Sequence, residues 1–147
     1  MKLKSTLLCA SALAVVAMAG STASAEEITI ATVNNNDMIV MQKLAPKWEE
    51  ATGNKINWVV LEENVLRQRT TQDISTNGGS FDIMFIGAYE TPIWGKNGWL
   101  TSLNDFADDA NYDVNDIFQL VRNGLSADGN LYAVPLYSET SFNFYRT

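Results

Sequence analysis

The sequence predicts an α/β fold built on parallel strands. Three apolar segments of strand length, at residues 27–33, 56–60 and 81–86, are each followed by a segment with helical periodicity. The connections between them are short, as is typical of parallel α/β units. Ligands of open α/β sheets bind beyond the carboxyl ends of the strands, so the loops after these segments are where a site is expected.

Residues 1–25 have the pattern of a cleaved secretory signal. Lys2 and Lys4 precede an apolar, alanine-rich stretch, and Ala23-Ser24-Ala25 supplies the small residues of a cleavage site. A membrane anchor is the alternative, but the apolar stretch is short for a span of about 20 residues. We therefore expect an exported, soluble protein whose mature chain begins at Glu26.

The composition of the mature chain excludes several classes of function. Cys9 is the only cysteine and there is no histidine, so the chain lacks a thiol site and the commonest general base and metal ligand. Removal of Lys2 and Lys4 leaves eight basic and seventeen acidic residues, a net charge of −9. Such a surface repels nucleic acid and anionic lipid, so we expect no nucleic-acid or membrane-surface partner.

The first two α/β repeats carry clear boundary signals. Asn36 or Asp37 is expected to cap a helix that ends near Gly53, while Pro46 should kink that helix or begin a second segment. After the strand 56–60, Asn64 is expected to cap a second helix. Asn77-Gly78-Gly79 should end that helix.

The later segments are predicted with weaker signals. Pro92 suits the first turn of a short helix that runs toward Lys96. Residues 103–115 are acidic and are interpreted as a solvated loop and helix entry, because their spacing lacks the glycine and terminal glutamate of a calcium loop. A helix is expected over 117–125. Asp128-Gly129 is a hairpin turn, and strands are expected over 131–137 and 141–145.

The loops after the three strands carry amides, carboxylates and a guanidinium. This mixture suits a neutral, hydroxyl-rich ligand, because carboxylates accept hydrogen bonds from hydroxyls while Asn and Arg can bridge neighbouring hydroxyls. Aromatic rings there offer flat apolar faces. The candidate ligand-binding residues are Asn35, Asn36, Glu62, Glu63, Arg67, Tyr89, Glu90, Trp94, Tyr137 and Glu139.

Each candidate also has a structural interpretation. Asparagines after a strand are good cap residues, and the Glu62-Glu63 pair can stabilise a helix N-terminus. Trp94 can belong to the core, and Arg67 can pair with surface acids. The argument for a site therefore depends on these residues lying together.

The chain resembles a known family in three segments. These are FDIMFIGAYE, GWLTSLNDF and DGNLYAVPLYSETSFNFYR, and they resemble extracellular solute-binding proteins of ABC sugar importers, the maltose-binding-like group. The segments TVNNNDM, WVVLEENVLRQR and GAYETPIWGKNGWL are similar to the sorbitol/mannitol-binding members. The resemblance covers essentially all of residues 26–147.

The resemblance implies a periplasmic binding protein-like fold of two lobes. It implies an N-terminal α/β lobe over residues 26–136 and, over 137–147, the start of a hinge crossover to a second lobe. The ten candidates would then lie in or near the cleft between lobes. The implied function is to bind a polyol or small sugar, as a monomer without cofactor or metal, and to present it to an ABC permease. Nothing follows Thr147, so the chain as written is expected to be most of the first lobe and should not close on a ligand by itself.

Two other functions are weighed against this one. A secreted glycoside hydrolase would use two of the glutamates at 62, 63, 90 and 139, but the adjacent pair at 62–63 does not by itself flank a scissile bond. A metal receptor would use Tyr89, Tyr137 and Tyr145 with carboxylates around a hard cation. The absence of histidine argues against the second alternative.

Overall fold

The computed structural model describes residues 25–139 and 143–146. The predicted signal segment lies outside the described residues except for Ala25, and so does the beginning of the strand expected at 141–145. Among the residues that the structure describes, no helix combines the length and hydrophobicity needed to cross a membrane.

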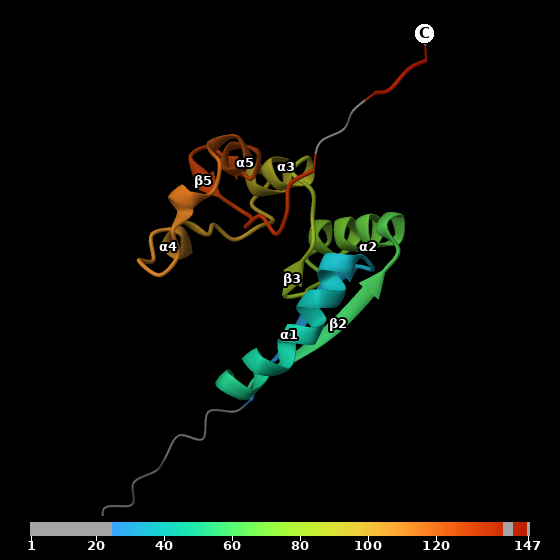
Figure 1. Ribbon diagram of the computed structural model, residues 1–147, viewed down its shortest axis with the longest axis vertical. Helices are drawn as coiled ribbons and strands as arrows, with labels where there is room; N and C mark the ends of the chain where they lie inside the picture. The colour runs from blue at the N-terminus through green and yellow to red at the C-terminus, as the bar shows by residue number, and fades with distance from the viewer. Residues whose placement is uncertain (1–24, 140–142, 147) are drawn as a thin grey trace, which may run out of the picture.

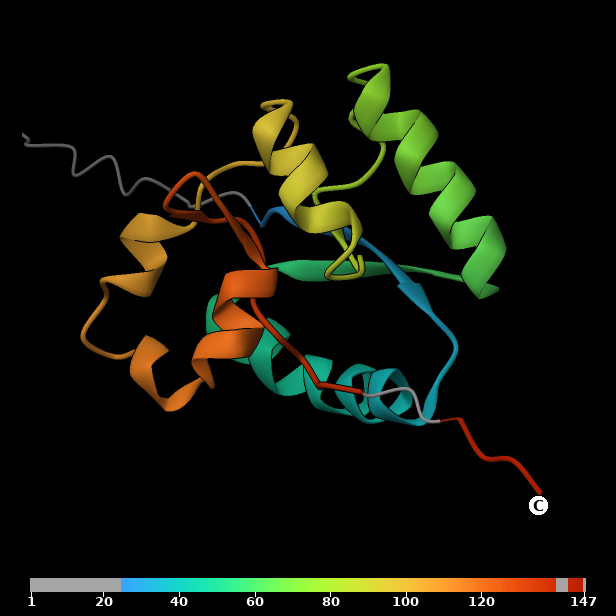
Figure 2. The ribbon, with the colours of Figure 1, turned by 90° about the horizontal axis from the view of Figure 1, so that it is seen from above.

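The predicted parallel α/β unit is confirmed. Its elements are β1 (Glu27–Val33), α1 (Asn36–Thr52), β2 (Lys55–Leu61), α2 (Glu63–Ser75) and β3 (Ile83–Met84). The three strands form a parallel sheet in the order β2-β1-β3. Figure 1 shows β2 and β3 of this sheet together with α1 and α2. Helix α1 lies on one side of the sheet and α2 on the other (Figure 2). The carboxyl ends of all three strands therefore meet at one edge.

The central strand β1 sets the register of the sheet. It pairs with β2 along its whole length, from Glu27 opposite Lys55 to Val33 opposite Leu61. The strand expected over 81–86 is shorter than predicted, because only Ile83 and Met84 pair as ladder residues with β1. Backbone hydrogen bonds extend this pairing by one residue at each end, with 3.0 Å from Asp82 N to Thr29 O and 2.8 Å from Phe85 N to Ala31 O. After Phe85 the chain leaves β1 and turns into the next helix.

Both predicted helix caps were wrong by one or two positions. Helix α1 is capped by Asn35, whose Oδ1 accepts a hydrogen bond from Met38 N at 2.9 Å, while Asn36 already belongs to the helix. Helix α2 is capped by Glu62, which accepts from the backbone N–H groups of Asn64 and Val65 at 3.0 and 3.2 Å. Because each helix starts sooner after its strand than expected, the cap moves toward the strand.

The other signals around α1 had mixed outcomes. Gly53 ends α1 with a φ of 77°, as its position predicted. Pro46 lies inside α1, which is one helix from Asn36 to Thr52, so a second segment beginning at Pro46 is wrong.

The apolar core of the α/β unit is small. Ala31, Met38, Ala45 and Leu66 are buried between the sheet and its helices. The exposed large apolar side chains include Ile39, Val40, Met41, Leu44 and Trp48 on α1.

The rest of the chain is built from short elements. They are α3 (Glu90–Lys96), α4 (Asn104–Ala107), the 3-10 helix η1 (Val114–Asp116), α5 (Gln119–Gly124), β4 (Ser126–Ala127) and β5 (Asn130–Leu131). The turn predicted at Asp128-Gly129 joins β4 to β5, with φ values of 50° and 84°. Pro92 lies in the first turn of α3, as expected.

Two predicted elements of this later part were too long. The helix expected over 117–125 is α5, six residues from Gln119 to Gly124. The strand expected over 131–137 ends at Leu131, because β5 pairs only with β4 and residues 132–136 have no strand beside them in the described part of the chain. The described residues of the last predicted strand, 143–145, have no regular structure.

Candidate functional site

Eight of the ten predicted site residues border one open cavity, which extends from the strand-end edge along the sheet to Phe81 and Asp82 before β3. The cavity has a volume of about 1780 Å³, larger than the roughly 300–1,000 Å³ of ordinary ligand pockets, because it is open rather than enclosed. The eight residues are Asn35, Glu62, Glu63, Arg67, Glu90, Trp94, Tyr137 and Glu139. Asn36 and Tyr89 are not among its lining residues, and both are exposed. We refer to the strand-end part of this lining as the wall.

A charged cluster of Arg67, Glu63 and Glu90 lies on this wall. One terminal nitrogen of Arg67 donates to Glu90 Oε1 at 2.7 Å and the other to Glu63 Oε1 at 3.0 Å. Helix α2 supplies Arg67 and Glu63 one turn apart, while Glu90 begins α3. The hydrogen bond to Glu63, followed by the charge of Glu90, raises the pKa of Arg67 above its ordinary value. The guanidinium is therefore a fixed cation held between two carboxylates.

The two carboxylates of this cluster differ in exposure. The Glu63 side chain is 65% exposed, whereas that of Glu90 is 16% exposed. The second oxygen of Glu90, Oε2, is buried and has no hydrogen-bond partner among the described residues. A Cβ atom built on Gly87 would lie 2.6 Å from this oxygen. Glu90 thus lies directly against the Gly87 backbone.

Tyr137 reaches the same edge from the later part of the chain. The Asn35 side-chain amide donates to the Tyr137 hydroxyl at 3.0 Å, and the Tyr137 ring lies 5.8 Å from the Phe85 ring between centroids. Burial raises the pKa of the Tyr137 phenol, and the charges of Glu139 and Asp37 add to this effect. The hydrogen bond from Asn35 opposes the rise. Asn35 therefore caps α1 with its oxygen and holds Tyr137 with its nitrogen.

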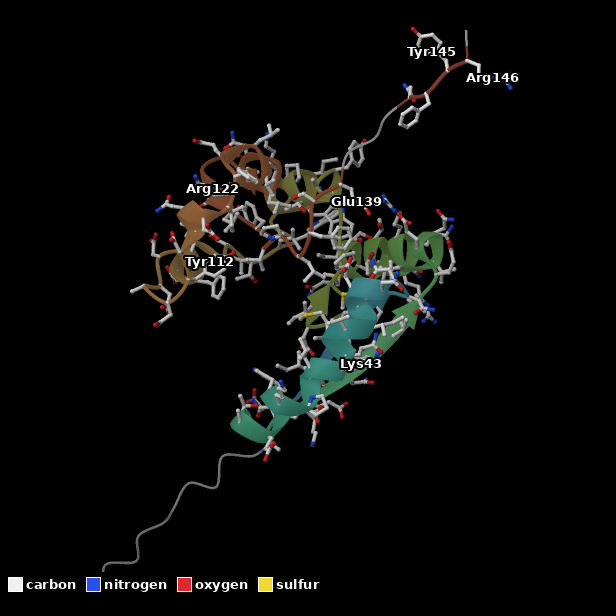
Figure 3. The ribbon with its side chains drawn as sticks, viewed as in Figure 1. Lys43, Tyr112, Arg122, Glu139, Tyr145 and Arg146 are labelled. Carbon is white, nitrogen blue, oxygen red and sulfur yellow. The ribbon has the colours of Figure 1, made fainter. Side chains whose placement is uncertain are left out.

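The remaining candidates have diverse environments. Glu62 uses its carboxylate to cap α2. Trp94 is 5% exposed, which agrees with its interpretation as a core residue. Tyr89 is 78% exposed, and Glu139 is exposed on the segment that continues toward the C-terminus (Figure 3).

The structure gives no support to a metal centre in the part of the chain that it describes. No group of three or more His, Cys, Asp or Glu side chains is placed there to hold an ion. The tyrosines proposed for a hard cation are scattered, since Tyr145 projects away from the helices and strands and is 87% exposed (Figure 3).

Sequence reasoning missed two residues of this wall. Phe85 supplies the ring against which Tyr137 lies, and Gly87 leaves room for the Glu90 carboxylate. Both lie in the SFDIMFIGAYE segment, but one was assigned to the interior of a strand and the other to a turn.

The comparisons with known proteins agree on one family. Residues 34–147 match the profile of a family described as bacterial extracellular solute-binding proteins. The mannitol-binding protein of Pseudomonas aeruginosa is 53% identical over 123 residues, which are 83% of this chain and 28% of that protein. The chain thus spans less than a third of the length of this curated relative.

Solved structures give the same picture. An ABC transporter solute-binding protein from Agrobacterium vitis S4 with bound D-mannitol superposes with a TM-score of 0.74 at 54% identity, over 77% of this chain and 27% of that chain. One from Agrobacterium radiobacter K84 in complex with ribitol gives a TM-score of 0.67 at 25% identity, over 74% and 28%. These relatives are named as binding proteins rather than enzymes.

Proposed function

This chain belongs to the bacterial extracellular solute-binding protein family, and we propose that it forms part of a receptor that binds a linear polyol for an ABC importer. The observation that carries the proposal is the acceptor-rich wall at the strand-end edge, where Glu63 and Glu90 flank Arg67. Its relatives named for mannitol and bound to mannitol or ribitol support the polyol class.

The charge of this wall selects a neutral ligand. Glu62, Glu63, Glu90 and Glu139 border the cavity together with a single candidate cation, Arg67. An anionic sugar acid or sugar phosphate would meet a net negative surface and be repelled. A polyol instead offers hydroxyl donors to the carboxylates and acceptors to the guanidinium. Because a linear polyol has no ring face, hydrogen bonds should dominate its binding over aromatic stacking.

The mechanism that we propose is closure of two lobes around the ligand. Residues 26–136 would belong to the N-terminal lobe, and residues 137–147 would begin the hinge crossover. Ligand contacts to both lobes would favour a closed state that the permease recognises. Residues 1–25 would be cleaved as the signal on export to the periplasm, and the receptor would act as a monomer.

No catalytic step is proposed. Glu63 and Glu90 both accept hydrogen bonds from Arg67, so these carboxylates share one cation and do not flank a scissile bond from two sides. The hydrolase alternative has no observation in its favour. Release of sugar from any glycoside by the purified protein would contradict our proposal.

The experiment begins with the nucleotide sequence after the Thr147 codon, which defines the complete reading frame. Protein expressed from that frame is titrated by calorimetry with D-mannitol, D-sorbitol and ribitol. Mannitol 1-phosphate serves as the charged control. We expect saturable binding of at least one neutral polyol and much weaker binding of the phosphate. Absence of binding to all three polyols would contradict the proposal.

A further inference from the structure

We propose that Glu90 is a positioning residue that orients Arg67, that Gly87 supplies the space which Glu90 needs, and that Arg67 is the group that contacts the ligand. This inference rests on the proposed function, because it assigns separate roles to residues of the same wall. It gives different roles to residues that the sequence indicated only together, as candidate ligand-binding residues.

The Glu90 carboxylate is already committed to protein contacts. Its Oε1 accepts the 2.7 Å hydrogen bond from Arg67, which is the shorter of the two ion pairs of that guanidinium. Its Oε2 is enclosed against Gly87. With the side chain only 16% exposed, a ligand cannot reach Oε2 unless Glu90 moves. Glu90 therefore borders the cavity with one carboxylate oxygen bonded to Arg67 and the other enclosed against Gly87.

Gly87 is not among the glycines with a positive φ, so its backbone conformation does not require a glycine. The arrangement requires a glycine there because a side chain would occupy the space of the Glu90 carboxylate. A Cβ at this position would lie 2.6 Å from Glu90 Oε2, far inside van der Waals contact. The Gly87 carbonyl is fixed by hydrogen bonds from Thr91, 3.2 Å from the backbone N–H and 2.9 Å from the hydroxyl. Because the backbone is held, an added methyl group must displace the flexible Glu90 carboxylate.

Arg67 is left free to donate to a ligand. Its side chain is 52% exposed, and it makes one hydrogen bond to Glu90 and one to Glu63. A guanidinium carries five N–H donors, so the other donors can face hydroxyl groups in the cavity. The rigid fork of Arg explains why its orientation matters, because neighbouring hydroxyls must match the spacing of the fork.

The test is a set of matched substitutions in the protein from the complete reading frame, with D-mannitol as the ligand. Gly87→Ala and Glu90→Gln should each weaken binding roughly tenfold or more, the scale of losing a hydrogen bond to a charged group. Gly124→Ala is the control, because its Cβ would meet only Ala88 at an ordinary 3.7 Å. That variant should keep the wild-type Kd.

The decisive measurement is whether the losses of mannitol-binding free energy add when two substitutions are combined. In the Glu90→Gln background, Gly87→Ala should cause no further loss, because Gly87 acts through Glu90. In an Arg67→Lys background, Glu90→Gln should also have little further effect, because a lysine has no fork to orient. Additive losses in either cycle, or an unchanged Kd in Gly87→Ala, would overturn the inference.

Two further outcomes separate this inference from the proposed function. If the wild-type protein binds mannitol and the losses in the variants are additive, only the roles assigned to Glu90, Gly87 and Arg67 are overturned. A wild-type protein that binds no polyol overturns both. Should Gly87→Ala fail to fold, the cycle of Glu90→Gln and Arg67→Lys still decides the question, because both substitutions nearly preserve side-chain volume.

Discussion

The α/β unit of residues 27–86 and the late region of residues 103–139 are built in different ways. The α/β unit has helices of 17 and 13 residues and two seven-residue strands. The late region has helices of four and six residues and strands of two. Regular elements therefore position Asn35, Glu63 and Arg67, whereas Tyr137 and Glu139 depend on the path of an irregular segment. The candidate site thus combines residues on long regular elements with residues on an irregular segment.

The largest expected effect is on the core of the α/β unit. Leu66 on α2 is 2% exposed, so Leu66→Ala should lower the free energy of unfolding by about 2–5 kcal/mol. Val65 beside it is 42% exposed, and Val65→Ala should change that free energy by no more than about 0.5 kcal/mol. Denaturant unfolding of the protein from the complete reading frame measures both.

Leu131 in β5 gives the counterpart in the late region, because it is 7% exposed. If the two regions differ in stability, Leu131→Ala should reduce hydrogen-exchange protection mainly around β4 and β5. Equal loss of protection in β1 and β2 would show that both regions unfold together. That result would contradict a difference in stability between them.

Two glycines, one in each region, allow the same substitution to be compared at an equal expected cost in backbone strain. Gly53 ends α1 with a φ of 77°, and Gly129 lies in the β4–β5 turn with a φ of 84°. A Cβ at either position would meet no atom within 4 Å, so only backbone strain acts. Gly53→Ala and Gly129→Ala should each cost about 1–2 kcal/mol locally.

The two glycine variants should differ in how far the cost spreads. Gly53→Ala is expected to lower the global free energy of unfolding, because α1 belongs to the larger unit. Gly129→Ala should appear as faster exchange around its own turn with a smaller global change. A full global loss in Gly129→Ala would contradict the idea of a weakly coupled late region.

The same contrast explains what the sequence could and could not predict. Strand β1, helix α1 and its Gly53 stop followed from local patterns, because periodicity and capping residues are local properties. The caps at Asn35 and Glu62 were misplaced, since they depend on where the strands end. The length of β5 depends on which strands lie beside it, which no local pattern records.

Within the candidate site, the gathering of these residues at one edge was predictable but their contacts were not. Asn, Glu and Arg after parallel strands must gather at one edge. The difference between Glu63 and Glu90, however, arises from Gly87, α3 and the fold of the 87–90 turn. The hydrogen bond from Asn35 to Tyr137 joins residues 102 positions apart, which lies beyond any local signal.

That long-range hydrogen bond provides a smaller test. Asn35→Ala removes both the cap of α1 and the partner of Tyr137, and it should cost about 1–2 kcal/mol of unfolding free energy. Tyr137→Phe removes only the hydroxyl and should cost about 0.5–1 kcal/mol. Denaturant unfolding of both variants and of the double variant measures the coupling between the regions. Fully additive costs would mean that the Asn35–Tyr137 contact contributes nothing to stability.

The smallest effect concerns the titration of two tyrosines. Burial raises the pKa of Tyr112 and of Tyr137 above the ordinary 10.0, but only Tyr137 also feels the charges of Glu139, Asp37 and Glu63. For an acid whose pKa is raised on folding, the stabilising contribution is present below the unfolded pKa. It is lost as the pH rises through the folded pKa. Stability should therefore decline above about pH 10, and this decline should be smaller in Tyr112→Phe and in Tyr137→Phe.

Salt separates the two causes of these shifts. Added salt screens the carboxylates around Tyr137 and should lower its pKa, while the shift of Tyr112, which comes from burial alone, should hardly change. Asn35→Ala should move the Tyr137 pKa further up, because the amide that opposes the rise is gone. Ultraviolet difference titration of wild type against each Phe variant assigns the two phenols. Equal salt responses would mean that the acidic residues of the strand-end edge do not surround Tyr137, and that the late region does not complete the wall formed by the α/β unit.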